Sequence, residues 1–190
     1  MSDDTPKLTK RQALVLGALG LAGFASESAA ADVKSVPRDL GEVTKTVVPY
    51  HGSEPHGTLL ISNAERVLLH VLKGASAARY EISVGRDGFL WTGATVVGRK
   101  AKWPGWWPPQ EMRQRQPELP AYVPPGPYNP LGARAIYLYE GGRDTLYRIH
   151  GTNNSATVGG FETSGCFRLS NADAIELYEQ VMPGAPVIVV

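Results

Sequence analysis

Short apolar segments separated by turn-forming residues constrain the fold of this chain most strongly. Residues 58–61 and 66–72 are rich in Leu, Ile and Val, and the polar stretch 62–65 between them is typical of a β-hairpin. Residues 79–84 alternate polar and apolar side chains. Strand character returns at residues 92–97, 135–139, 145–149 and 186–190. The sequence therefore predicts a mostly β domain.

One segment near the C-terminus has the pattern of a helix. Asn171 is expected to cap it, and Pro183 and Gly184 are expected to end it. Its apolar face would comprise Ala174, Ile175, Leu177, Tyr178 and Val181. This is the one clear α-helix that the sequence predicts.

A stretch rich in proline and glycine, residues 102–130, predicts a long irregular excursion from the strands. Trp103, Trp106 and Trp107 lie in it. Their rings could stack on a sugar or line a peptide cleft, or they could simply pin the excursion to the domain. Arg134, just beyond it, could meet a substrate carboxylate or form a structural ion pair.

The N-terminal sequence predicts an export signal at residues 1–31. A basic start is followed by an uncharged, mostly apolar stretch and by Ala29-Ala30-Ala31, which offers a cleavage site before Asp32. Residues 9–14 resemble a weakened twin-arginine signal; an ordinary Sec signal or an uncleaved anchor are the alternatives. We expect a periplasmic product with a flexible segment at residues 32–56 and one catalytic domain at residues 57–190.

Composition restricts the possible partners and cofactors. The chain has 190 residues, is 43% hydrophobic and 19% charged, and carries a net charge of +1. It can bury one core, and its charge gives no indication of nucleic-acid binding. One cysteine excludes an intrachain disulfide, and no His or Cys spacing predicts a metal site.

That cysteine, Cys166, lies sixteen residues after His150. A thiol needs a base or a cation nearby to act as a nucleophile at neutral pH, and histidine commonly supplies it. Gly and Asn residues between the two favour a loop, so we expect two neighbouring segments. Gly165 would let a substrate carbonyl approach the backbone, and N–H groups around Gly165 and Cys166 are candidates for an oxyanion hole. The alternative is an unreactive thiol.

The segment from His150 to Arg168 resembles the active-site signature of the L,D-transpeptidases of the YkuD type. In that signature a His-Gly pair is followed, after a loop, by Ser/Thr-x-Gly-Cys-x-Arg. Here it reads His150-Gly151 and then Thr163-Ser164-Gly165-Cys166-Phe167-Arg168. Residues 81–109 and 129–139 resemble the proteobacterial branch, and the resemblance covers roughly residues 57–190. Many members carry His where this chain has Ser164.

The resemblance implies a curved β-sandwich with the cysteine and histidine at one end. It implies that Cys166 attacks the third residue of a peptidoglycan tetrapeptide stem, normally meso-diaminopimelate, and expels D-alanine, with His150 moving the proton. The Gly151 carbonyl would hold the His150 tautomer, and Thr163 would bond within the cysteine loop. Arg168 would orient that loop or the substrate carboxylate. The resemblance also implies acylation of Cys166 by carbapenems. We expect no cofactor.

Several acceptors and two rival functions remain open. The acceptor could be a second stem, giving a 3-3 cross-link, an outer-membrane protein, a D-amino acid, or water. Water would make the enzyme a carboxypeptidase or amidase. A non-catalytic wall-binding module is the other rival. We expect a monomer that acts on peptidoglycan stem peptides.

Overall fold

The computed structural model describes residues 40–190. The export signal expected at residues 1–31, and residues 32–39 of the segment expected to be flexible, lie outside the described residues. The described chain forms these elements: β1 (Thr46–Pro49), β2 (Leu59–Ser62), β3 (Val67–Leu72), β4 (Ser76–Glu81), β5 (Val84–Gly85), β6 (Gly93–Lys102), α1 (Gln110–Arg115), β7 (Arg134–Glu140), β8 (Arg143–His150), the 3-10 helix η1 (Ser155–Thr157), β9 (Phe161–Thr163), β10 (Phe167–Arg168), α2 (Asn171–Gln180) and β11 (Pro186–Val189).

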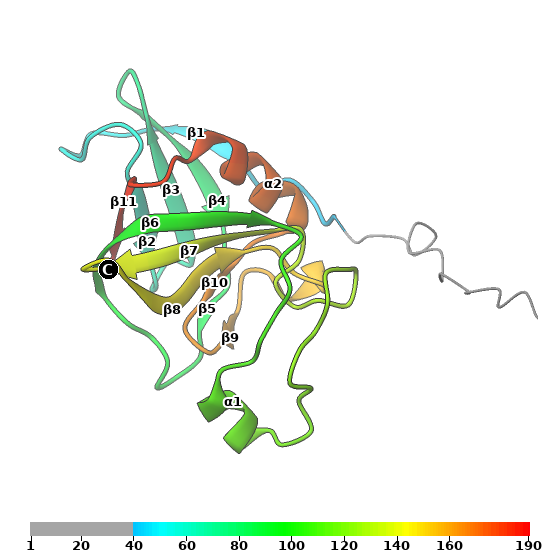
Figure 1. The fold of residues 1–190 in the computed structure, drawn as a ribbon. Coiled ribbons are helices and arrows are strands. Elements are labelled where there is room, and N and C mark those ends of the chain that lie inside the picture. Colours follow the sequence, from blue (N-terminus) through cyan, green and yellow to red (C-terminus); the bar gives the residue numbers. More distant parts are fainter. Residues whose placement is uncertain (1–39) are drawn as a thin grey trace, which may run out of the picture. The chain divides into compact units, whose positions relative to one another are not determined.

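Nine of the described strands form one sheet, in the order β1-β4-β3-β2-β11-β6-β7-β8-β10 (Figure 1). Its neighbours are antiparallel, except that β11 runs parallel to β2 and β10 runs parallel to β8. Strands β5 and β9 form a small second sheet. Reciprocal backbone hydrogen bonds between Ser83 and Arg168 join the segment after β4 to β10, at the far end of the large sheet. The large sheet therefore curves, which confirms the predicted curved β-sandwich.

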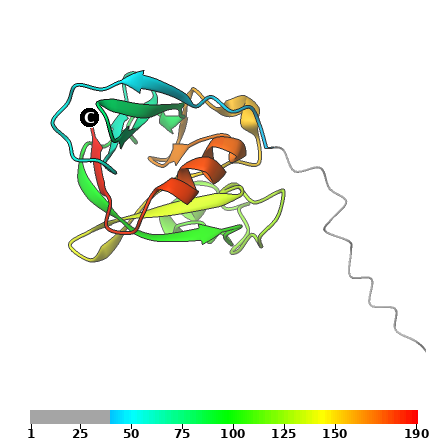
Figure 2. The same ribbon diagram turned by 90° about the horizontal axis from the view of Figure 1, so that it is seen from above.

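The core lies between the inward faces of the strands and the helix α2, which crosses β7 (Figure 2). Apolar side chains at alternate positions are fully buried, as Leu59 and Ile61 are in β2. Ala174 and Leu177 of α2 are buried in the same cluster. Removing one such Leu or Ile side chain from water contributes about 1.5–3 kcal/mol to folding. This apolar pattern is why the strands were predictable.

Helix α2 begins one residue earlier than the predicted cap implied. The Oγ of Ser170 accepts a hydrogen bond from the N–H of Asp173 at 3.0 Å, so Ser170 is the N-cap and Asn171 is the first helical residue. At the other end, the Lys100 ammonium donates to the carbonyls of Tyr178, at 2.5 Å, and Val181, at 2.6 Å. A cation at that end stabilises the last, otherwise unpaired carbonyls.

The predicted hairpin is confirmed: β2 pairs antiparallel with β3, and Leu59 lies opposite His70. Part of the segment expected to be flexible is instead ordered, because residues 46–49 form β1 at the edge of the sheet. The buried Asp173 carboxylate accepts hydrogen bonds from the N–H and hydroxyl of Thr44 and anchors this strand. Val47 in β1 is largely exposed, so the strand has no apolar pattern that the sequence could reveal.

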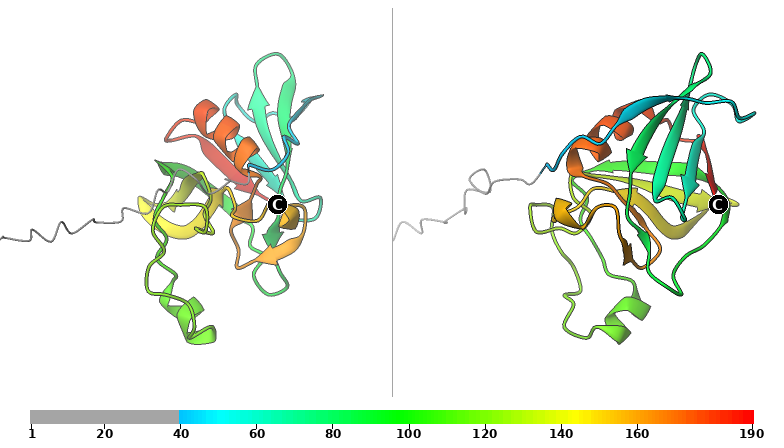
Figure 3. Two further views of the ribbon diagram at one scale, coloured as in Figure 1. Left: turned by 90° about the vertical axis from the view of Figure 1, so that its right-hand side faces the viewer. Right: turned by 180° about the vertical axis from the view of Figure 1, so that it is seen from behind.

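The predicted excursion connects β6 to β7 and projects beyond the strands (Figure 3). It is not wholly irregular, because it carries the short helix α1 and a β-bridge between Trp106 and Val123. Among residues 40–190, no helix has the length and apolar content needed to cross a membrane.

Candidate active site

The register of β8 and β10 brings Cys166 and His150 to one face of the sheet. Phe167 lies opposite Ile149, and Arg168 lies opposite His150. Phe167 and Ile149 are buried in the core. Side chains alternate along a strand, so Cys166, Arg168 and His150 project from the opposite face. The predicted neighbouring segments are thus confirmed, and β8 and β10 are those segments.

Gly165, the residue before Cys166, occupies a position that only glycine fits. Its φ is +103°, and a Cβ there would lie 2.7 Å from the Tyr147 ring and 3.2 Å from the Phe89 carbonyl oxygen. The indole N–H of Trp91 donates to the Gly165 carbonyl at 2.9 Å, and the Trp91 ring stacks on Tyr147 at 4.3 Å. These contacts hold the backbone of the cysteine loop, residues 163–166.

Two side chains complete this loop. The Thr163 hydroxyl donates to the Cys166 carbonyl at 2.6 Å and accepts from the Gly165 N–H at 3.2 Å. Arg86 donates to the Ser164 hydroxyl at 3.1 Å. Thr163 therefore bonds within the loop, whereas Ser164 accepts a hydrogen bond from outside it, from Arg86, which follows β5.

His150 is held as a neutral imidazole. Its Nδ1 lies 2.6 Å from the Gly151 carbonyl oxygen. A carbonyl can only accept, so Nδ1 carries the hydrogen and Nε2 keeps its lone pair. Burial, with the charges of Arg168 and then Arg148, lowers the pKa of His150 to about 4, against the opposing Gly151 hydrogen bond. His150 can therefore accept a proton at neutral pH.

Cys166 rests as a thiol. Its Sγ lies 3.8 Å from the Leu146 carbonyl oxygen, to which the thiol can donate. Burial raises the pKa of the Cys166 thiol, against the lowering effects of a hydrogen bond to the Arg148 backbone and of the Arg148 and Arg168 charges, and Asp144 adds a smaller raising effect. A neutral thiol beside a neutral imidazole needs proton transfer at the moment of attack, which is the arrangement for general-base catalysis.

Arg168 is tied to the residues around the cysteine loop. Its Nη1 donates to the Thr157 hydroxyl at 2.7 Å and lies 3.7 Å from a Glu162 carboxylate oxygen. Its backbone pairs with Ser83 on one side and lies opposite His150 on the other. Its Nε is buried without a hydrogen-bond partner among the described residues. These bonds suit a buttressing role, and the Nε leaves one donor for another group.

Asn171 joins three parts of the site, a role that the sequence did not suggest. Its Oδ1 accepts from the N–H groups of Ala133, at 2.7 Å, and Thr152, at 3.1 Å. Its Nδ2 donates to the Thr152 carbonyl at 2.6 Å. A Cβ on Gly151 or Gly132 would lie 2.2 Å from this amide oxygen. Asn171 thereby fixes the turn after His150 against the end of the excursion. In the sequence, only its place in the motif Leu169-Ser170-Asn171 pointed to a role near the site.

Arg134 lies on the other face of the sheet. Ala135 is opposite His150, so its neighbour Arg134 projects the other way. Its guanidinium lies over the Tyr178 ring at 5.3 Å and 3.9 Å from a Glu179 carboxylate oxygen, both on α2. This placement argues against the expected contact of Arg134 with a substrate carboxylate at Cys166 and favours the structural ion pair.

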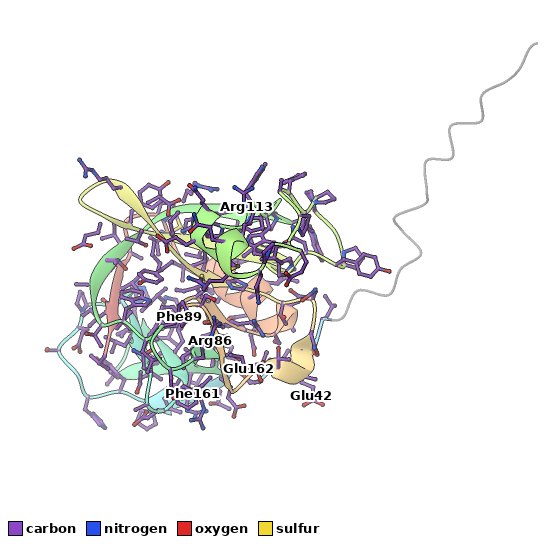
Figure 4. All side chains as sticks on the ribbon, turned by 90° about the horizontal axis from the view of Figure 1, so that it is seen from below. Glu42, Arg86, Phe89, Arg113, Phe161 and Glu162 are labelled. Atoms are coloured by element: carbon purple, nitrogen blue, oxygen red, sulfur yellow. The ribbon has the colours of Figure 1, made fainter. Side chains whose placement is uncertain are left out.

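The excursion borders the site at two places, at its base and near its tip. At its base, Ala133 bonds to Asn171. Near its tip, the Arg115 guanidinium lies 5.0 Å from the centre of the Phe89 ring, and Arg86 lies 4.2 Å from the same centre. In the view of Figure 4, Phe89 and Arg86 lie close together, below Arg113, which is a residue of α1.

The tryptophans of the excursion serve its own structure in part. The Trp107 ring lies 4.4 Å from that of Tyr122 yet remains 67% exposed. Trp106 bridges Val123, and Trp103 begins the excursion with a φ of +43°. Trp107 is thus the ring of the three that presents most surface to an arriving molecule.

Two cavities are found within residues 40–190 that are not lined by Cys166. One, of about 290 Å³, is lined in part by Trp91 and Tyr147, the rings that contact Gly165. The other, of about 200 Å³, lies among Glu65, Arg66, Arg79 and Glu81. Within residues 40–190, no three His, Cys, Asp or Glu side chains are grouped as a metal site would require.

Comparison with known sequences gives one consistent family. The sequence model of the L,D-transpeptidase catalytic domain family, YkuD, matches residues 56–189. A protein of Escherichia coli K12 named "Probable L,D-transpeptidase YbiS" is 38% identical over 141 residues, which cover 70% of this chain and 44% of that relative. The chain thus spans less than half the length of that relative.

Solved structures share the fold. A Brucella melitensis protein named "Probable carnitine operon oxidoreductase caia" is 36% identical, with a TM-score of 0.54 over 84% of this chain and 99% of that one. L,D-transpeptidase 3 of Mycobacterium tuberculosis is 16% identical, with a TM-score of 0.54 over 72% of this chain and 61% of that one. At 16% identity the second likeness shows the fold alone.

Proposed function

The chain belongs to the L,D-transpeptidase catalytic domain family, and from that premise we propose that it transfers an acyl group through a thioester on Cys166. The donor is a peptidoglycan tetrapeptide stem. The observation that carries the proposal is the pairing of β8 with β10, which sets the thiol of Cys166 on the same face as a neutral imidazole with a fixed tautomer.

In the first half-reaction, His150 Nε2 takes the Cys166 proton as the sulfur attacks the carbonyl carbon of the third stem residue. The tetrahedral intermediate collapses as the bond to the terminal D-alanine breaks. The imidazolium returns its proton to the departing amine, which leaves the thioester on Cys166. The same imidazole then takes a proton from the acceptor amine as the amine attacks the thioester carbonyl. The C–S bond breaks, and the imidazolium gives its proton to the leaving sulfur, which regenerates the Cys166 thiol.

The Gly151 carbonyl supplies the orientation that a third catalytic side chain provides in other triads. It accepts from Nδ1–H at 2.6 Å, so Nε2 is left as the base. When His150 becomes an imidazolium, burial and the charges of Arg168 and Arg148 disfavour the charged form, although the bond to Gly151 partly stabilises it. The pKa of about 4 favours the return of the proton to the leaving amine.

The developing oxyanion is stabilised by the Cys166 N–H. The Gly165 N–H already donates to the Thr163 hydroxyl, whereas the Cys166 N–H makes none of the hydrogen bonds found within residues 40–190. A free, preorganised N–H aimed at the developing negative charge is the kind of donor that forms an oxyanion hole. Gly165, which carries no side chain, leaves the approach to it open.

The excursion acts as a lid over the bound stem, and Trp107 offers a surface for stacking. Arg168 buttresses the cysteine loop through Thr157. The acceptor is the amine of a second stem or of an outer-membrane protein, in the periplasm after removal of residues 1–31. The same acyl-enzyme would serve a carboxypeptidase if water were the acceptor.

Product analysis tests this function. Incubation with a disaccharide-tetrapeptide should release D-alanine and form tripeptide-linked dimers, and Cys166→Ala should form neither while its melting temperature stays close to wild type. Free tripeptide without dimers would identify a hydrolase. Binding to sacculi that persists in Cys166→Ala, with no D-alanine released by wild type, would instead support the wall-binding module.

A further inference from the structure

Arg148 faces Cys166 across the pair of parallel strands. Each lies one position before a residue of the opposed pair Ile149 and Phe167, so their side chains leave the same face at the same level. The Arg148 side chain is only 13% exposed. A largely buried guanidinium is therefore held on the face that carries the thiol, although Arg148 lies outside the His-Gly and Gly-Cys signature.

The guanidinium has fixed partners on two sides. Its two terminal nitrogens donate to both carboxylate oxygens of Asp144, at 2.6 and 3.0 Å. It also lies 4.4 Å from the centre of the Tyr137 ring, and Arg99 lies over that same ring at 3.3 Å. A bidentate pair stacked on an aromatic ring has little rotational freedom, so the charge beside the sulfur is positioned rather than mobile.

Asp144 also shapes the backbone that faces the thiol. One carboxylate oxygen accepts from the Leu146 N–H at 2.8 Å, and Leu146 has a φ of +65°, a costly conformation for leucine. The pairing of β7 with β8 is irregular between Tyr137 and Tyr139, around this point. The Leu146 carbonyl is the group within reach of the Cys166 Sγ. Asp144 thus binds the N–H of Leu146, the residue whose carbonyl faces the thiol, and also binds the Arg148 guanidinium.

We propose that Arg148 is a positioning residue that stabilises the Cys166 thiolate as His150 removes its proton, and that Asp144 limits this effect. The inference rests on the proposed nucleophile. A positive charge on the same face as a partly buried sulfur favours the thiolate, and a carboxylate paired with it partly cancels that charge. Arg168 on β10 also lowers the pKa of the thiol, and its own charge is partly balanced by Glu162 on β9; His150 on β8 lies on the same face as Cys166.

The pH dependence of Cys166 alkylation by iodoacetamide measures this effect without any substrate. Arg148→Met should move the midpoint of the alkylation profile up by about one pH unit, and Arg148→Lys should restore most of that shift. Asp144→Asn keeps an oxygen for the Leu146 N–H and removes the negative charge, so it should move the midpoint down. Arg99→Met is the matched control, because it removes a cation from the other contact of the same ring and should leave the midpoint unchanged.

Opposite shifts for Arg148→Met and Asp144→Asn would support the proposal. Unchanged midpoints in both, or an equal shift in Arg99→Met, would overturn it. If Arg148→Met does not fold, the downward shift in Asp144→Asn still decides. The proposed function fails separately: wild type would then be alkylated normally but would form no acyl-enzyme with a tetrapeptide stem.

Discussion

At the scale of single residues, the site depends on two groups that burial keeps neutral. The pKa of Cys166 is raised and that of His150 is lowered, each chiefly by burial. A thiolate–imidazolium pair formed in advance is therefore disfavoured, so in the proposed mechanism the proton moves during attack. His150→Ala should lower the acylation rate by at least ~10²-fold, the low end of general-base contributions, in a single-turnover assay. A rate within a few-fold of wild type would remove His150 from the mechanism.

Burial of His150 also predicts a dependence of stability on pH. Its pKa falls from 6.5 to about 4 on folding, so between these values the unfolded chain binds more protons. The stability associated with neutral His150 is present above pH 6.5 and is lost as the pH falls toward 4. The free energy of unfolding should fall across this window with a slope of up to about 1.4 kcal/mol per pH unit. Urea unfolding of wild type and His150→Gln at several pH values should show that the variant lacks this contribution. If the free energy of unfolding fell equally with pH in both proteins, the buried neutral imidazole would be contradicted.

At the scale of elements, the excursion is attached near the cysteine loop by the contact between Arg115 and Phe89. The Phe89 carbonyl in turn borders Gly165. A change at Phe89 should therefore affect both α1 and the loop that carries Cys166.

Phe89→Ala should loosen α1 while leaving the sandwich intact. Amide hydrogen exchange in residues 103–130 should speed up several-fold, with little change in β8. Phe161→Ala is a matched control: that ring also takes a cation, Arg66 at 5.0 Å, but it lies on β9 and outside the contact with α1. Equal exchange in the two variants would contradict the attachment.

Asn171 joins elements that are far apart in the sequence, and its loss should be costly. Asn171→Ala leaves buried N–H groups of Ala133 and Thr152 without their acceptor, at about 1–3 kcal/mol each. Ser170→Ala, which removes only the helix cap, should cost about 1 kcal/mol. Chemical denaturation that ranks Ser170→Ala as the more harmful change would refute this role.

At the scale of the whole described chain, the sequence predicted those features that depend on local pattern. The alternation of apolar residues gave most of the strands, and the short link between His150 and Cys166 predicted that their segments are neighbours. Strands β9 and β10 have three and two residues, too few for any periodicity to show. Edge strand β1 buries little. Arg148 and Asn171 act through partners on other strands, and only the register of the folded sheet reveals those contacts.

Acyl transfer through Cys166 is tested most directly by intact-mass spectrometry of the protein incubated with a disaccharide-tetrapeptide, followed by fragmentation to locate any adduct. If Cys166 is the nucleophile, the protein should gain a mass equal to the stem minus D-alanine, carried on Cys166 and absent from Cys166→Ala. Release of D-alanine by Cys166→Ala, or an adduct on another residue, would contradict Cys166 as the nucleophile.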